Sequence, residues 1–202
     1  MRALGAIVLA AGPSERFGTE NKLLAEIGGD ALIRVVVGAV IGASIADVVV
    51  VTGSDEEGIA TALESLPLRQ VHNANWRSGM GTSIAAGIAA LGKDIEGAFV
   101  VPGDMPRLTS DLFLCLAAAF EESRRQAIVF PANAAGEQRN PVLWPRRFFP
   151  ELMTLSGPKG AKALLKARSS ECLAVPVEDP AILEDIDTQE DLQAARLPMG
   201  SK

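Results

Sequence analysis

Residues 6–29 read AIVLAAGPSERFGTENKLLAEIGG, and this stretch decides the fold. It begins as a continuous apolar run, turns at Ala11-Gly12-Pro13, and then places Arg16 and Lys22 in a short polar loop. An apolar run of this length predicts a strand that is buried on both faces, as in a parallel sheet. Because ligands of open α/β sheets bind beyond the carboxyl ends of the strands, the basic loop is placed where a ligand would lie.

Apolar runs of strand length alternate with helical segments along the rest of the chain. Besides residues 5–10, strands are predicted over residues 47–53, 69–73, 97–104, 126–132 and 171–177. Helices are predicted over residues 31–43, 54–66, 81–92 and 109–125, and after residue 133 we expect a loop, a strand and two helices. This order is typical of an α/β fold with three α/β/α layers and a mostly parallel, Rossmann-like sheet. We expect one domain over residues 1–196 and a tail over residues 197–202.

Capping residues and cysteines give further local expectations. Asp30, Ser54 and either Thr82 or Ser83 are expected to cap the helices that follow them. Cys115 and Cys172 lie in apolar contexts, and we interpret them as buried, reduced thiols.

Composition excludes several classes of function. The 202 residues carry a net charge of −6, whereas a nucleic-acid surface needs a basic patch or stripe. The longest uncharged apolar stretch, residues 35–46, is too short for a membrane span of about 20 residues, so a cytoplasmic protein is expected. His72 is the only histidine, and no nucleophile elbow is present, so a catalytic triad is not predicted.

The loop after the first strand has features of an anion site. Small side chains at Ala10, Ala11 and Gly12 let a ligand approach the backbone amides, and Gly12 can take a positive φ. Arg16 and Lys22 can bind phosphate oxygens. The loop matches neither standard phosphate-binding pattern, so an ordinary strand–turn with solvated charges remains open.

Two acids separated in sequence are candidate metal ligands. Asp104 comes just after a buried strand, and Asp187 alternates with Ile186 and Asp185 in a predicted strand end over residues 184–187. Mg²⁺ is typically bound by one or two carboxylates together with substrate phosphates. A turn aspartate at 104 and a helix cap at 187 are the structural alternatives.

Residues 73–87, NANWRSGMGTSIAAG, form a second glycine-rich entry into a helix. Gly79 and Gly81 permit a close approach, and the helix N-terminus favours anions. A plain loop with a cap explains the same pattern equally well. Trp76 and Trp144 are interpreted as packing or pocket-wall residues.

The segments LAAGPSERFGTENKLL, VVVVTG, HNANWRSGMGTSI, VVPGDMPRLTSDLF, NPVLW and DIDTQEDL together resemble the molybdenum cofactor cytidylyltransferases. These belong to a nucleotidyltransferase superfamily with a nucleotide-diphospho-sugar transferase-like fold. The resemblance implies transfer of CMP from CTP to the phosphate of molybdopterin with Mg²⁺, and a molybdoenzyme or its maturation factor as a possible partner. It implies catalytic roles for Arg16, Lys22 and Asp104, and Mg²⁺ binding by Asp104 and Asp187. The nucleotide-binding residues it implies are Leu9, Ala10, Ala11, Gly12, Arg16, Lys22, Gly79, Ser83 and Gly103.

The sequence indicates the class of reaction, but it leaves more than one nucleotide and acceptor substrate open. Ala-Ala-Gly at residues 10–12 is similar to the cytidylyl members, whereas guanylyl members tend to have Ala-Gly-Gly. Relatives also carry Gly-His-Pro where this chain has Arg139-Asn140-Pro141, and Gly-Asp-x-Gly where it has Gly157-Pro158-Lys159-Gly160. A guanylyltransferase using GTP, a sugar-phosphate nucleotidyltransferase, a dinucleotide-dependent oxidoreductase and a non-catalytic cofactor-delivery module remain alternatives.

Overall fold

The strand predicted at residues 5–10 is the third strand of a seven-stranded sheet. The computed structural model describes residues 3–14, 17 and 21–196. The strand order in the sheet is β5-β4-β1-β6-β8-β7-β9. These strands are β1 (Leu4–Ala10), β4 (Asp47–Thr52), β5 (Arg69–His72), β6 (Gly97–Pro102), β7 (Ile128–Ala132), β8 (Val142–Pro145) and β9 (Cys172–Pro176). The strand β8 is antiparallel to both of its neighbours, and the other pairings are parallel.

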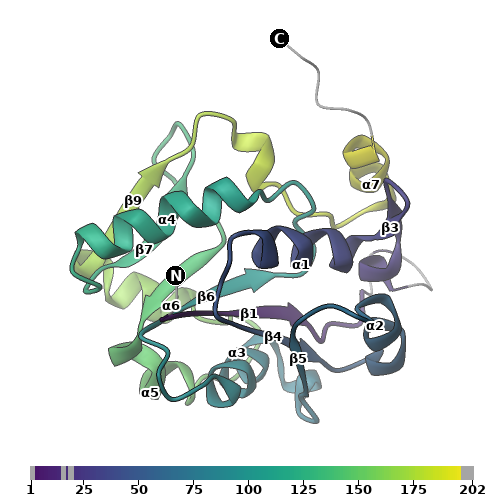
Figure 1. Cartoon of the computed structure of the whole chain (residues 1–202), viewed down its shortest axis with the longest axis horizontal. Helices are drawn as coiled ribbons and strands as arrows, with labels where there is room; N and C mark the ends of the chain where they lie inside the picture. The colour runs from purple at the N-terminus through teal and green to yellow at the C-terminus, as the bar shows by residue number, and fades with distance from the viewer. Residues whose placement is uncertain (1–2, 15–16, 18–20, 197–202) are drawn as a thin grey trace.

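Helices cover both faces of this sheet, which confirms the three-layer prediction (Figure 1). On one face lie α1 (Leu32–Gly42) and α4 (Ser110–Glu122). On the other lie α3 (Met80–Ala90), α5 (Phe149–Leu152) and α6 (Lys162–Ala167). The remaining helices are α2 (Glu56–Ala62) and α7 (Gln189–Arg196), and a small hairpin pairs β2 (Glu26–Ile27) with β3 (Asp30–Ala31). Short 3-10 helices are η1 (Lys22–Leu24), η2 (Trp76–Ser78), η3 (Arg146–Phe148), η4 (Ser169–Glu171) and η5 (Pro180–Leu183).

Alternating side chains of the central strand fill two separate cores. Ala6 and Val8 belong to the core beneath α1 and α4, whereas Ile7 belongs to the core on the α3 side. All three are fully buried. Full burial of an aliphatic side chain contributes about 1.5–3 kcal/mol, so a strand that is apolar on both faces is stable only between two layers of helices.

The order in which the strands are connected forms a crevice at the carboxyl ends of the central strands. The chain runs from β1 to β4 and β5 on one side, and then returns through α3 to β6 on the other side of β1. The direction of winding therefore reverses beside β1. Crevices at the carboxyl ends of strands form at such reversals, and the loops after β1, β4 and β6 meet there.

Most of the predicted helix caps are different in the structure. Asp30 pairs with Ile27 in the β2–β3 hairpin, and α1 begins after Ala31 without a side-chain cap. Asp55, not Ser54, caps α2 by accepting a hydrogen bond from the Gly58 amide. Gly79 occupies the N-cap position of α3, so neither predicted residue of that helix is the cap.

Three other predictions need correction or fall outside the structure. Residues 185–187 form an irregular segment, not a strand end. Neither cysteine is fully buried: Cys115 is exposed, Cys172 is partly exposed, and both are free thiols. The tail expected at residues 197–202 lies outside the described residues. Among the described residues, none of the helices is long and apolar enough to cross a membrane.

Candidate functional site

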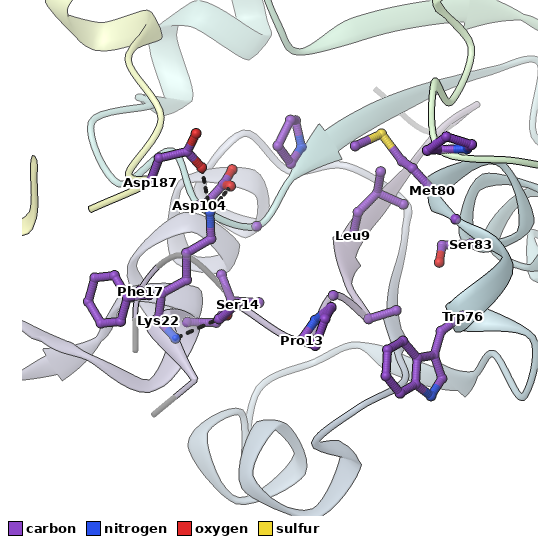
Figure 2. Close-up of a pocket in the computed structure, with 17 residues that line it drawn as sticks. Leu9, Pro13, Ser14, Phe17, Lys22, Trp76, Met80, Ser83, Asp104 and Asp187 are labelled. Carbon is purple, nitrogen blue, oxygen red and sulfur yellow. Dashed lines mark hydrogen bonds and ion pairs between the residues drawn. The ribbon is translucent and has the colours of Figure 1, made fainter. Parts of the chain in front are cut away.

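A cavity of about 390 Å³ opens at the carboxyl ends of β1 and β6. Figure 2 shows Lys22, Asp104 and Asp187 on one side of it, and Trp76, Met80 and Ser83 on the other. Nine of the predicted residues line this cavity: Leu9, Ala11, Gly12, Lys22, Gly79, Ser83, Gly103, Asp104 and Asp187. Ala10 instead packs into the core on the α1 side, and Arg16 lies outside the described residues.

The loop after β1 is fastened by hydrogen bonds on both sides. The Ser54 hydroxyl donates to the Gly12 carbonyl oxygen at 2.9 Å. The Ser14 hydroxyl donates to Asn21 Oδ1 and accepts from the Lys22 amide, each at 3.1 Å. Ser14, with φ of 54°, takes the left-handed conformation anticipated for Gly12. Among the residues that the structure describes, apart from the two chain neighbours of Gly12, no heavy atom lies within 4 Å of a Cβ built at Gly12, so these residues leave its backbone open.

Lys22 links the two acids that the sequence analysis selected. Its Nζ atom donates to Asp104 Oδ2 at 2.7 Å and to Asp187 Oδ1 at 3.2 Å. A third bond, of 2.7 Å, goes to the Ile186 carbonyl oxygen. The segment around residue 187 is held there because the Ile186 amide donates to the Asp104 carbonyl oxygen. Two acids 83 positions apart thus meet at one cation.

The side chain of Asp187 is not the cap of α7. Thr188 and Asp191 cap that helix, since Thr188 Oγ1 accepts from the Asp191 amide and the Thr188 amide donates to Asp191 Oδ2. This is the reciprocal arrangement of a capping box. The Asp187 carboxylate faces Lys22 instead (Figure 2).

Burial and charge oppose each other at this ion pair. Burial lowers the pKa of Lys22, but the charge and hydrogen bonds of Asp104 and Asp187 outweigh it, and the pKa of Lys22 is raised overall. Burial also raises the pKa of Asp104, and the nearby Lys22 ammonium only partly reverses this effect. The lysine therefore stays charged at neutral pH, and a further cation would favour the ionised form of Asp104.

The donor set suits a hard divalent cation. Asp104, Asp185 and Asp187 each offer a carboxylate oxygen, and these oxygens lie within 4.8 Å of one another. Asp104 Oδ1 is buried and has no hydrogen-bond partner among the described residues. A buried carboxylate oxygen without a partner is costly, and a metal ion would satisfy it. Asp185 was not assigned a role from the sequence, although its alternation with Asp187 was visible there.

The glycine-rich segment before α3 packs against protein as well as lining the cavity. A Cβ at Gly81 would lie 2.7 Å from backbone atoms of Ser156, and one at Gly79 would lie 2.4 Å from the Gly157 carbonyl carbon. These glycines are therefore required by the segment that passes over them. Ser83 accepts a hydrogen bond from Asn73 Nδ2 at 3.0 Å and is buried.

The histidine and the tryptophans lie where the sequence analysis expected. His72 ends β5, pairs with Glu56 at 3.1 Å, and is not among the residues that line the cavity. Trp76 forms one wall and is covered by the Arg77 guanidinium at 4.3 Å from its ring centre. Trp144 is buried in the core.

Comparisons with known proteins give relatives of more than one activity. Nicotine blue oxidoreductase of Paenarthrobacter nicotinovorans is 25% identical over 190 residues, covering 92% of this chain and 93% of that protein. The bifunctional protein GlmU of Agrobacterium fabrum is 33% identical over 132 residues, which are 64% of this chain. The matched stretch spans only 27% of GlmU, about a quarter of its length.

Solved structures share the fold. Rv0371c from Mycobacterium tuberculosis superposes with a TM-score of 0.82 at 20% identity, covering 96% of this chain and 97% of that one. A second structure of Rv0371c, a complex with manganese, superposes with a TM-score of 0.72.

A protein-family model matches a part of the chain that includes most of β1, the loop after it and Asp104. Residues 6–172 match the model of the MobA-like NTP transferase domain, which is most of the chain. The chain therefore belongs to the family of MobA-like NTP transferase domains.

Proposed function

We propose that this protein is a nucleotidyltransferase that transfers CMP from CTP to the phosphate of molybdopterin and releases pyrophosphate. One observation supports this most strongly: Lys22, Asp104 and Asp187 converge in a cavity at the end of β1, beside an open glycine backbone. A nucleoside triphosphate needs such a combination of a cation, exposed amides and metal-binding carboxylates.

The proposed reaction is an in-line displacement at phosphorus. An oxygen of the acceptor phosphate attacks the α-phosphorus of CTP and forms a new P–O bond. The bond from the α-phosphorus to the bridging oxygen breaks, and pyrophosphate leaves with that electron pair. No general base is needed, because the attacking phosphate is already ionised; this agrees with the placement of His72 outside the cavity.

The chain's residues act through position and charge. Asp104 and Asp187, with Asp185, would hold Mg²⁺, which when bound neutralises phosphate charge. Lys22 then exchanges its carboxylate partners for phosphate oxygens and stabilises charge on the leaving pyrophosphate. Arg16, in the undescribed part of the same loop, is proposed to add a second cation. Ala11 and Gly12 line the cavity, and their amides are proposed to donate hydrogen bonds to phosphate oxygens.

The choice of base and acceptor rests on the sequence resemblance. Ala11, in place of glycine, favours CTP over GTP. The manganese complex of Rv0371c supports a divalent metal, with Mg²⁺ proposed as the physiological ion. A molybdoenzyme or its maturation factor is proposed to receive the product.

Nicotine blue oxidoreductase supports a second candidate, a dinucleotide-dependent oxidoreductase, since the two chains match over nearly their full lengths. Melting curves with CTP, GTP, ATP, UTP and NADPH, each with Mg²⁺, separate the candidates. A ligand at 100 times its dissociation constant adds about 2.7 kcal/mol of stability. We expect the largest shift with CTP; a shift with NADPH alone would favour the oxidoreductase.

A further inference from the structure

The cavity at the end of β1 has a second side, which lies opposite its charged groups. Figure 2 shows Trp76, Met80 and Ser83 there, away from Lys22 and Asp104. If the triphosphate lies beside Lys22, as proposed above, the nucleoside has to occupy this opposite side. Ser83 offers a hydroxyl group there, and its other contacts decide whether that hydroxyl donates or accepts a hydrogen bond in the cavity.

Asn73 lies behind this wall and is not among the residues that line the cavity. It directly follows β5 and is only 5% exposed. Its Nδ2 atom donates to Thr82 Oγ1 at 2.9 Å and to Ser83 Oγ at 3.0 Å. Its Oδ1 atom accepts from the Asn75 amide at 3.0 Å. Both hydrogens and the oxygen of this buried side-chain amide therefore have partners, as buried polar groups require.

Backbone groups fix which atoms donate in this cluster. The Asn75 amide can only donate, so Asn73 turns its oxygen toward it and its NH₂ group toward α3. The Thr82 hydroxyl donates to the carbonyl oxygens of Gly79 at 2.9 Å and Asn75 at 3.0 Å, so its single hydrogen is not available to Asn73. Asn73 therefore donates one amide hydrogen to Thr82 and the other to Ser83.

This arrangement leaves the hydrogen of the Ser83 hydroxyl for a ligand. The oxygen of that hydroxyl already accepts from Asn73, and a hydroxyl has only one hydrogen to donate. No acceptor among the described residues receives this hydrogen. Ser83 is only 4% exposed, and a buried donor without a partner is costly. A bound molecule that presents an acceptor atom to this wall would satisfy it.

We propose that Asn73 is a positioning residue for recognition of the nucleobase. It holds the Ser83 hydroxyl as a donor to an acceptor atom of the base, either a carbonyl oxygen or an unprotonated ring nitrogen. An amino group of the base is rejected at the same place, because two donors would then face each other. This inference rests on the proposed binding of a nucleoside triphosphate, and Asn73 acts on the base through Ser83 without touching it.

Calorimetric titrations of the full chain with CTP and with inorganic triphosphate, both with Mg²⁺ at pH 8.5, test this role. Triphosphate lacks a base, so only the affinity for CTP should depend on Asn73. Asn73→Asp keeps the shape of the side chain, but its carboxylate can only accept, so the Ser83 hydroxyl turns toward it. We expect CTP to bind about tenfold more weakly, because the acceptor on the base loses its donor. Gln70→Glu, which adds the same charge at an exposed position of β5, is the matched control and should leave both affinities unchanged.

Ser83→Ala separates the orientation of the hydroxyl from the effects of charge and packing. It should weaken CTP binding by a similar factor, and adding Asn73→Asp to it should weaken CTP binding no further. An equal loss from Asn73→Asp in both backgrounds, or equal weakening of CTP and triphosphate, would overturn the positioning role. If Asn73→Asp does not fold, Ser83→Ala alone decides: a loss confined to CTP supports the proposal, and unchanged CTP binding overturns it. If the unmodified protein binds neither ligand, the proposed function fails together with this inference, whereas binding of both without any effect of the variants overturns the inference alone.

Discussion

Lys22 Nζ lies 2.7 Å from Asp104 Oδ2, so a cation of the chain itself sits among the carboxylates that would hold a metal ion. The same ammonium lies 3.2 Å from Asp187 Oδ1. Metal and lysine therefore compete for these oxygens, and a nucleotide relieves the competition because its phosphates give Lys22 a new partner. Metal and nucleotide are expected to bind cooperatively.

Replacing Lys22 should have opposite effects on the two ligands. Lys22→Met should raise the affinity for Mn²⁺ alone about tenfold or more, since even a single unit charge about 4 Å from the ammonium is repelled by roughly 1–4 kcal/mol, and Mn²⁺ carries two. The same change should weaken binding of CTP in the presence of Mg²⁺. Titration of Mn²⁺ followed by electron paramagnetic resonance measures the first effect. Lys93→Met, an exposed lysine remote from the acids in sequence, is the control; weaker Mn²⁺ binding in Lys22→Met would contradict the competition.

Asp104 should matter for rate more than for folding. Asp104→Asn keeps the size of the side chain but removes its charge, and we expect the transfer rate to fall by about 10²–10³, as for loss of one positioned electrostatic group. Pyrophosphate release measures the rate, and circular dichroism checks that the fold is retained. Asp94→Asn, an exposed acid, should be unaffected. A near-normal rate in Asp104→Asn would remove the metal assignment.

Asp185 should contribute to metal binding. Its carboxylate lies within 4.8 Å of the other two acids, so Asp185→Asn should weaken Mn²⁺ binding at least about tenfold, the lower end of what loss of a supporting group costs. Glu178→Gln, an exposed acid outside the cluster, provides the matched comparison. Identical Mn²⁺ affinities in the two variants would leave Asp185 without this role.

Gly81 should be required for packing. In Gly81→Ala the new Cβ would lie 2.7 Å from the Ser156 backbone, and such overpacking costs about 1–3 kcal/mol. Gly38→Ala, in α1 with open space around the added carbon, should instead stabilise by about 0.5–1 kcal/mol. Urea unfolding of both variants measures the difference, and equal midpoints would show that the segment over Gly81 moves aside.

The cap of α7 should make stability depend on pH. Hydrogen bonds from Thr188 lower the pKa of Asp191, so its stabilising effect is complete above the unfolded-state pKa of about 3.9. That effect is lost as the pH falls through the lower folded-state pKa. Asp191→Ala should therefore melt below the unmodified protein at pH 7, with the gap closing in acid. A gap that persists unchanged at pH 2 would contradict this assignment.

Local sequence patterns predicted the elements better than their ends. The apolar run at β1 was visible because it depends on adjacent residues alone. The prediction that Asp30 caps α1 was wrong because Asp30 pairs with Ile27 and belongs to the β2–β3 hairpin. The exposure of Cys115 could have been predicted from the helical period, because the buried face of α4 runs through Leu112, Leu116 and Phe120 and Cys115 lies off that face.

The sequence predicted which residues contribute to the candidate site, but it did not predict how their side chains contact one another. Asp104 could be selected because an acid directly after a buried strand has no packing role. The contact between Lys22 and both acids depends on segments more than 80 residues apart, which no local pattern specifies. Gly79 and Gly81 were expected only to permit a ligand's approach or to belong to a plain loop, and their packing under residues 156–158 could not be predicted because that segment is distant in sequence.

Release of pyrophosphate tests the central claim most directly. The full chain is incubated with CTP, Mg²⁺ and molybdenum-loaded molybdopterin, beside Asp104→Asn and reactions with GTP, ATP and UTP. We predict stoichiometric pyrophosphate and a cytidine dinucleotide of the cofactor, with CTP preferred and the variant nearly inactive. No pyrophosphate from any of the four nucleotides, or equal release by Asp104→Asn, would contradict the account.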